Sequence, residues 1–197
     1  VRQGLKQILV EAFNDGIFGE AQNAAEALSL VRQQPWDIIV LDLTLPGESG
    51  LDVLKQIRHD YPQLPVLILS MHPENQYAVR TIKAGAAGYL TKESAPEELV
   101  QAIRKIQSGG KYISDSVAEK LAIHVVADDD KPPHERLSDR EYQIMCMIAS
   151  GKEVKQIADE LSLSVKTVST YRTRLLEKMN MQTNAELTYY AISNQLV

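Results

Sequence analysis

The chain is poor in cysteine and has no long apolar run. Its single cysteine, Cys146, cannot form an intramolecular disulfide, which is typical of a protein in a reducing compartment. No apolar stretch approaches the roughly 20 residues of a membrane-spanning helix, and no signal-peptide pattern opens the chain. We therefore expect a cytoplasmic protein with no membrane segment.

Glycine-rich phosphate-binding motifs are also missing. The sequence contains neither G-x-G-x-x-G nor a P-loop, so a nucleotide-binding interpretation lacks its phosphate cradle. The net charge of −5 argues weakly against a nucleic-acid binder. The charge is unevenly spread, however, because residues 164–179 carry four Lys or Arg against one Glu, a local charge of +3.

Strand-like and helix-like patterns alternate over residues 1–110. Apolar runs typical of buried strands occupy 38–42, 65–70 and 88–91, with a further short candidate at 17–21. Helical spacing predicts helices over 1–13, 24–31, 75–84 and 96–108, and one that Ser49 begins as N-cap. Ser94 and Glu97 suggest a capping box for the helix at 96–108. The alternation predicts a doubly wound, mainly parallel α/β sheet.

Three polar residues stand at corresponding ends of the predicted strands: Asp42, Ser70 and Lys92. Each has an ordinary explanation on its own, since an aspartate or a serine can cap a turn and most lysines are solvated. In a parallel sheet, however, the carboxyl ends of the strands share one edge, where chemistry is usually placed. A carboxylate nucleophile, a hydroxyl and a fixed cation at that edge suit phosphoryl transfer.

Residues 1–110 resemble a response-regulator receiver domain, which has a flavodoxin-like α/β fold. The resemblance rests on the spacing of Asp42 to Ser70, the order Tyr89-Leu90-Thr91-Lys92, the loop Leu45-Pro46-Gly47 with Gly50, and the stretch 84–89. It implies that Asp42 accepts a phosphoryl group from a sensor histidine kinase or a small acyl phosphate. It also implies that Ser70 is the switch hydroxyl, Tyr89 the switch aromatic and Lys92 the charge-neutralising lysine.

The resemblance further implies Mg²⁺ beside the acceptor, held by Asp42 and the Thr44 carbonyl. The family also places two acidic residues for the metal at the end of a first strand, but this chain begins in the helix that follows. That strand would lie inside a sheet of order 2-1-3-4-5. We therefore expect the 197 residues to be a truncated form of a longer native protein.

Residues 111–136 read as a linker with a short helix at 114–126, followed by the acidic run 128–130 and two prolines. Residues 137–197 show only helical patterns, with capping boxes at Ser138 and Thr183. Two of these helices, 154–161 and the basic 165–179, are joined by a tight turn, which is typical of a helix-turn-helix. A small all-α bundle for protein contact is the alternative.

Residues 137–197 resemble the LuxR-type helix-turn-helix, seen in the runs 137–141 and 161–168, so the whole chain resembles the NarL/FixJ family of response regulators. The resemblance implies that Ser169, Thr170 and Thr173 face DNA bases. It places the other polar residues of the helix mostly at phosphates: Lys166, Thr167, Arg172, Arg174 and Lys178. Short hydroxyls pair with several bases and do not predict an operator sequence. The last helix, 184–194, is implied to form a two-fold contact through Leu187, Tyr190 and Ala191, in a homodimer that also uses a receiver face.

The sequence thus predicts a phosphorylation-controlled, DNA-binding transcription regulator rather than an enzyme, with self-catalysed phosphoryl transfer to Asp42 and its hydrolysis as the only chemistry. An orphan regulator that binds DNA without phosphorylation is one alternative. An aspartate-nucleophile phosphatase is a weaker one, because Thr44 occupies the position where such enzymes need a second aspartate.

Overall fold

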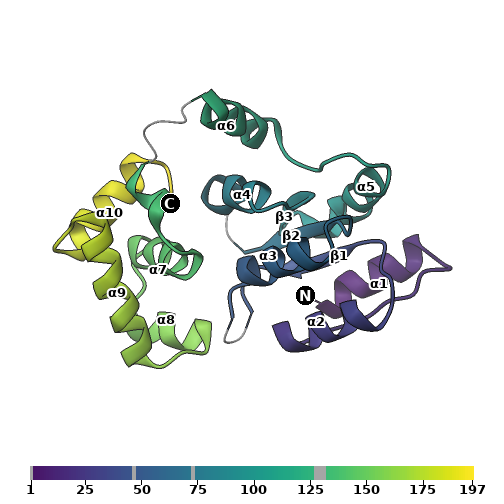
Figure 1. Ribbon diagram of the computed structural model, residues 1–197, viewed down its shortest axis with the longest axis horizontal. Helices are drawn as coiled ribbons and strands as arrows, with labels where there is room; N and C mark the ends of the chain where they lie inside the picture. Colours follow the sequence, from purple (N-terminus) through teal and green to yellow (C-terminus); the bar gives the residue numbers. More distant parts are fainter. Residues whose placement is uncertain (1, 46–47, 72–73, 127–131) are drawn as a thin grey trace. The chain divides into compact units, whose positions relative to one another are not determined.

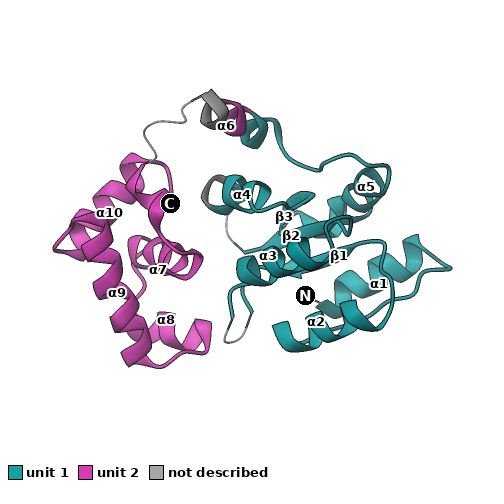
Figure 2. Cartoon of the chain, in the orientation of Figure 1, with its two compact units in different colours: residues 1–118 teal, residues 119–197 magenta. Residues whose placement is uncertain are grey.

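The computed structural model describes residues 2–45, 48–71, 74–126 and 132–197. The chain folds into two compact units, residues 1–118 and 119–197, called here the first and second unit (Figures 1 and 2). Their division falls inside helix α6 (Asp115–Val126), which lies within the predicted linker. The Pro46-Gly47 turn and the acidic run 128–130 lie outside the described residues.

The first unit is built on a parallel sheet of three strands in the order β1-β2-β3. The strands are β1 (Ile39–Asp42), β2 (Val66–Ser70) and β3 (Gly88–Thr91). Every residue of the central strand is buried, as its unbroken apolar sequence predicts for a strand covered on both faces. The helices of this unit are α1 (Arg2–Ala12), α2 (Ala24–Gln33), α3 (Gly50–Asp60), α4 (Glu74–Lys83) and α5 (Ala95–Gln107). This arrangement confirms the predicted α/β class.

Two helical layers enclose the sheet. Leu67 and Leu69 of β2 pack with Leu99 and Ile103 of α5 and with Leu5 of α1. Because alternate residues of a strand point to opposite faces, the rest of β2 faces the layer of α3 and α4, which contact β1 and β3. Apolar packing on both faces of the sheet therefore fixes the positions of the strand ends.

The predicted strand at 17–21 is wrong. These residues run without regular structure along α1, where Glu20 forms ion pairs with Lys6 and with Arg2 (Nε–Oε2 3.2 Å). A segment forms a β-strand only where a neighbouring strand accepts and donates its backbone hydrogen bonds. Within the described residues no strand pairs with this segment. Ile17 accordingly stays 80% exposed.

The predicted capping box at Ser94 is also wrong, whereas Ser49 is the N-cap of α3 as expected. The Ser94 backbone is already helical, and its hydroxyl makes no cap hydrogen bond. The Ser94 hydroxyl is hydrogen-bonded to Thr91 instead. Thr91 Oγ1 donates to Ser94 Oγ at 3.1 Å and accepts from the Ser94 N–H at 3.2 Å. These bonds close the turn that carries Lys92.

Helices make up the second unit, as predicted. They are the short 3₁₀ helix η1 (Pro133–Arg136) and the α-helices α7 (Asp139–Ala149), α8 (Val154–Leu161), α9 (Val165–Met179) and α10 (Asn184–Ser193). Ser162, in the left-handed conformation (φ 54°), makes the tight turn after α8, and Ser164 caps α9. Within the described residues, no helix of the chain is long and apolar enough to span a membrane.

An ion pair between the buried Glu141 carboxylate and Lys178 fixes α9 to the start of α7. Ser138 and Glu141 form the predicted capping box, and Glu141 Oε2 also accepts from Lys178 Nζ at 2.7 Å. Only 4% of the Glu141 side chain is exposed. Burial alone would raise the pKa of Glu141, but the bonds from Lys178 and the Ser138 N–H outweigh it and hold that pKa below its usual value.

We predict that Glu141→Gln lowers the free energy of unfolding of the second unit by about 1–3 kcal/mol at pH 7, because Lys178 loses its charged partner. Since the folded-state pKa is depressed, the ionised carboxylate stabilises the fold fully above the unfolded-state value of about 4.3. This stabilisation is lost as the pH falls through the folded-state pKa, so the difference between wild type and variant shrinks in acid.

Urea unfolding of the full-length protein at pH 7 and pH 4, followed by hydrogen exchange in α7 and α9, measures this effect. Glu160→Gln is the matched control, because it breaks the exposed pair of Lys152 and Glu160 and should cost less than about 1 kcal/mol. Equal losses in the two variants would show that the Glu141 pair does not hold α9.

Candidate phosphoryl-acceptor site and nucleic-acid interface

The strand register brings the three predicted strand-end residues to one edge of the sheet. Asp42 is in register with Leu69, the residue before Ser70. The Lys92 N–H then donates to the Ser70 carbonyl at 2.7 Å, which continues the ladder one residue past β3. Asp42, Ser70 and Lys92 thus lie together at the carboxyl ends of adjacent strands, as the sequence predicted.

The Asp42 carboxylate has a partner on each oxygen. Oδ1 accepts from the Thr44 N–H at 2.9 Å, and Oδ2 forms an ion pair with Lys92 Nζ. The Lys92 side chain is 15% exposed and that of Asp42 is 32% exposed, so the aspartate remains open to solvent while the lysine is mostly enclosed. This geometry offers an accessible carboxylate beside a fixed positive charge.

Gly50 allows the chain to turn tightly behind Asp42. Its N–H donates to the Leu43 carbonyl at 3.0 Å. A Cβ at this position would lie 2.3 Å from the Asp42 carbonyl oxygen, a contact that no side-chain rotation relieves. Glycine is therefore required here by the close approach of the backbone rather than by an unusual φ angle.

Ser70 and Tyr89 form a buried hydroxyl pair next to the carboxylate. Ser70 is 0% exposed and Tyr89 is 1% exposed, and their side chains are hydrogen-bonded across adjacent strands. Burial raises the pKa of the Tyr89 hydroxyl well above its ordinary value, while the bond with Ser70 lowers it and the nearby Glu74 carboxylate raises it further. Tyr89 is thus a neutral side chain that already points into the first unit.

The oxygen donors for the predicted Mg²⁺ are few. Within the described residues, no group of three or more His, Cys, Asp or Glu side chains could hold a metal ion. Asp42 and the Thr44 carbonyl supply hard oxygen ligands of the type that Mg²⁺ prefers, so the donor chemistry fits. The remaining octahedral positions would fall to water and to phosphoryl oxygens.

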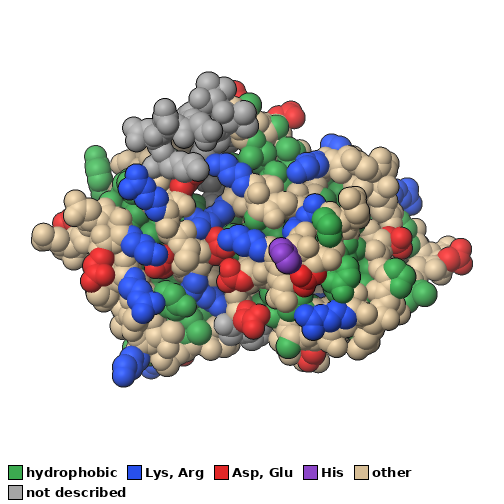
Figure 3. Space-filling model, viewed as in Figure 1, with side chains coloured by type: hydrophobic (Ala, Val, Ile, Leu, Met, Phe, Trp, Pro, Cys, Tyr) green, Lys and Arg blue, Asp and Glu red, His purple; other side chains and the backbone are tan. Residues whose placement is uncertain are grey.

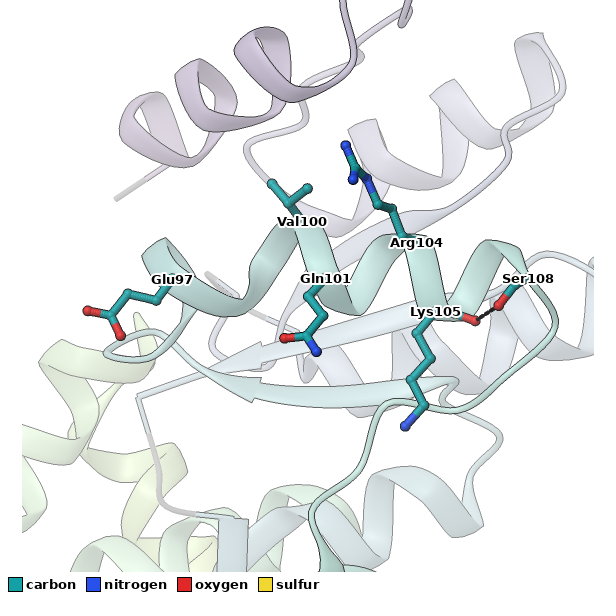
Figure 4. A pocket seen from close by; sticks show the side chains of 6 residues that line it. All are labelled: Glu97, Val100, Gln101, Arg104, Lys105 and Ser108. Atoms are coloured by element: carbon teal, nitrogen blue, oxygen red, sulfur yellow. Dashed lines mark hydrogen bonds between the residues drawn. The ribbon is translucent and has the colours of Figure 1, made fainter.

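A hollow of about 630 Å³ lies elsewhere on the first unit, along α5. Its lining residues are Glu97, Val100, Gln101, Arg104, Lys105 and Ser108. Five of them come from α5 and Ser108 is its C-cap, and Figure 4 shows their side chains splayed apart rather than converging on a common point. The hollow is therefore not the reactive site.

The second unit presents the polar face of α9 to solvent. Of the predicted DNA-contacting residues, Thr167 and Arg172 are half-buried, and the exposed ones are Lys166, Ser169, Thr170, Thr173, Arg174 and Lys178. Figure 3 shows Lys and Arg side chains over the α9 side of this unit. The hydroxyls of Thr170 and Thr173 donate to carbonyls one turn back (3.0 and 3.1 Å), which leaves oxygen lone pairs and methyl groups for an outside partner.

The cations of α9 differ in how they are held. Arg172 Nε donates to Asn184 Oδ1 at 2.6 Å, and Lys178 is paired with Glu141. Lys166 and Arg174 make no side-chain hydrogen bond or ion pair with any residue that the structure describes. Two of the four cations are therefore available without breaking an internal contact.

The predicted contact residues of the last helix need correction. Leu187 and Ala191 are 0% exposed and belong to the core formed where α10 packs on α7, so they cannot meet a second molecule. Tyr190 is half-buried, and its hydroxyl is 2.9 Å from His134 Nδ1. The large apolar side chains that α10 does expose are Tyr189 (77%) and Ile192 (60%).

Sequence reasoning missed His134. It lies in η1, where the predicted linker meets the second unit, and its ring is 5.9 Å from that of Tyr190 and 6.3 Å from that of Tyr142. A histidine after two prolines gave no periodic signal, so only the structure could show that it ties the linker end to α10.

Comparison with known proteins agrees with this geometry. Residues 1–104 match the family model "Response regulator receiver domain", and residues 135–191 match "Bacterial regulatory proteins, luxR family". Response regulator UvrY of Escherichia coli (strain K12) is 36% identical over 197 residues, which are 100% of this chain and 90% of that protein. Response regulator GacA of Pseudomonas aeruginosa is 35% identical over 198 residues, covering 100% and 92%.

Among solved structures, the RcsB response regulator of Salmonella typhimurium has a TM-score of 0.59 at 23% identity, with 96% of this chain and 92% of that chain covered. At this identity the likeness shows the fold alone.

Proposed function

The chain belongs to the response-regulator family, with a receiver domain and a luxR-type regulatory domain, and we propose that phosphorylation of Asp42 controls its binding to DNA. The observation that carries this proposal is the accessible Asp42 carboxylate beside Lys92, with the Ser70–Tyr89 pair behind it. The family consists of regulators rather than enzymes. We assign the receiver to residues 1–110, the linker to 111–136 and the DNA-binding domain to 137–197.

The chemistry starts with a donor phosphate, either the phosphohistidine of a sensor kinase or a small acyl phosphate. A carboxylate oxygen of Asp42 attacks the phosphorus, the bond to the donor nitrogen or oxygen breaks, and its electron pair leaves with the donor. Lys92 Nζ is positioned to move from the carboxylate to the new phosphoryl oxygens. Bound Mg²⁺, held by Asp42 and the Thr44 carbonyl, would supply further charge neutralisation. Water attack on the acyl phosphate later restores Asp42.

The Ser70 hydroxyl converts this charge change into a conformational one. It is bonded to Tyr89 in the unmodified protein. A phosphoryl group on Asp42 brings strong acceptors to the same strand edge, and Ser70 then donates to one of them. Tyr89 loses its partner while remaining buried, which favours a new arrangement of the surrounding elements.

DNA is bound in the major groove by α9, the second helix of the helix-turn-helix. Ser169, Thr170 and Thr173 face base edges. The inward-donating threonines offer acceptors and methyl groups, which complement adenine N6 and the thymine methyl. The phosphate contacts come from Lys166, Thr167, Arg172, Arg174 and Lys178. Lys166 and Arg174 can contact phosphates without breaking an internal hydrogen bond or ion pair with a described residue.

The active species is a homodimer in the cytoplasm, formed through residues 184–194, which contain α10, and through a receiver face. In α10 the contact falls to Tyr189 and Ile192, whose exposure suits an interface that closes over apolar side chains. A two-fold axis here would place two copies of α9 on a palindromic site.

The phosphoryl acceptor is tested by incubating the full-length protein with Mg²⁺ and a small acyl phosphate, then mapping the adduct by mass spectrometry. We expect one phosphoryl group on Asp42 and none in Asp42→Asn. Asp37→Asn is the control, because it removes an exposed carboxylate at the other end of β1 and should leave labelling intact. Labelling that survives in Asp42→Asn would move the acceptor elsewhere.

The phosphate contacts are tested by measuring DNA affinity over a range of salt concentrations. Arg174→Ala should weaken binding to every DNA sequence and reduce the slope of log K against log salt by roughly one. Arg32→Ala removes the same charge from α2 in the first unit and should leave the slope unchanged. Identical slopes for the two variants would contradict a phosphate contact at Arg174.

A further inference from the structure

Residues 111–114, called here the strap, return to the sheet after α5. The Tyr112 N–H donates to the Ala87 carbonyl at 2.9 Å, and the Tyr89 N–H donates to the Tyr112 carbonyl at 3.1 Å. Tyr112 thereby forms a parallel bridge with Gly88. The strap acts as a one-residue fourth strand beside β3, and one of its two backbone bonds is to the candidate switch residue itself.

Side chains anchor the strap to the helices on either side. Tyr112 Oη donates to Glu98 Oε2 of α5 at 2.7 Å, and Lys105 Nζ lies 5.6 Å from the centre of the Tyr112 ring. Burial and the Glu98 carboxylate raise the pKa of Tyr112 to about 12, so the hydroxyl keeps the proton that it donates. At the other end, Ser114 Oγ donates to Glu74 Oε2 at the start of α4.

Gly88 makes the close approach of the strap possible. A Cβ on this residue would lie 2.8 Å from the Tyr112 carbonyl oxygen, and 3.0 Å both from Tyr112 Cβ and from a methyl carbon of the Leu67 side chain, which can rotate away. The glycine is thus required by the strap rather than by its own backbone angles. A substitution here pushes the strap away from β3 and leaves every strap side chain unchanged.

Glu74 links the strap to the buried hydroxyl pair. Its carboxylate holds Ser114 and is also close enough to Tyr89 to influence the titration of that hydroxyl. When Ser70 turns toward a phosphoryl group, the Tyr89 hydroxyl loses its partner and Tyr89 shifts. The Tyr89 N–H is bonded to the Tyr112 carbonyl, so this shift is passed directly to the strap.

We infer that the strap reads the state of Asp42: a shift of Tyr89 weakens the backbone bonds between β3 and Tyr112, and the strap is loosened. This inference rests on the proposed function, since it needs a phosphoryl group on Asp42. Ser114 also accepts from the Val117 N–H in the first turn of α6, so the loss of its anchor reaches α6 directly. Tyr112 and Ser114 are positioning residues that act through Tyr89 and Glu74.

Amide hydrogen exchange of the full-length protein, with and without beryllofluoride as a phosphoryl mimic, tests the inference. In the wild type we expect exchange at residues 112–117 to rise roughly tenfold on adding beryllofluoride, which corresponds to one lost hydrogen bond. Asp42→Asn should show no such rise. Gly88→Ala should show fast exchange in the strap under both conditions.

The role of the Ser114 hydroxyl is separated from general destabilisation by paired variants. Ser114→Ala should show the raised exchange without beryllofluoride, and Ser114→Thr, which retains a hydroxyl, should behave as wild type. Ser108→Ala is the control, because it removes a hydroxyl bonded only within the end of α5. Wild-type exchange in Ser114→Ala would overturn the anchoring role.

Mass spectrometry with a small acyl phosphate separates failure of the inference from failure of the proposed function. A protein that takes no phosphoryl group on Asp42 would refute both. A protein that is phosphorylated there but keeps the same strap exchange would refute the strap alone.

Discussion

The ion pair between Asp42 and Lys92 is the interaction on which the rest of the structure depends. It joins the ends of β1 and β3 across the central strand, and it forms only because the parallel register places both residues at one sheet edge. Gly50 then lets α3 start directly behind the carboxylate. A phosphoryl group on Asp42 changes the charge that Lys92 neutralises, at the point where the core of the first unit is most tightly specified.

Two further networks carry that change outward in our account. In the first unit, the path runs from the Ser70–Tyr89 pair through the backbone bond of Tyr89 with Tyr112, and then along the strap to α6. In the second unit, Glu141 and Lys178 hold α9 against α7. Each network contains a polar group that is almost fully buried, Ser70 and Tyr89 in the first and Glu141 in the second, so the loss of a partner there is costly.

Local patterns predicted much of this molecule. The apolar runs gave β1 and β2 with the residues at their ends, and the Ser49 and Ser138 caps were recognised because capping depends on neighbours in the sequence. Apart from the Ser94 cap, which is lost to the nearby Thr91, the failures depend on distant contacts. Residues 17–21 lack a strand partner, Leu187 and Ala191 turn toward α7, and Tyr112 pairs with β3 across a whole helix. The spacing of apolar residues within a segment does not indicate which distant part of the chain that segment will pack against.

The central claim is that the state of Asp42 sets the affinity of α9 for DNA, and one measurement tests it most directly. The full-length protein is titrated against an operator selected from random duplexes, with and without phosphorylation, alongside Asp42→Asn. We expect phosphorylation to tighten wild-type binding by about tenfold, within the usual range of coupling between two sites, and to leave the variant unchanged. Equal affinities of phosphorylated and unmodified wild type would contradict the account.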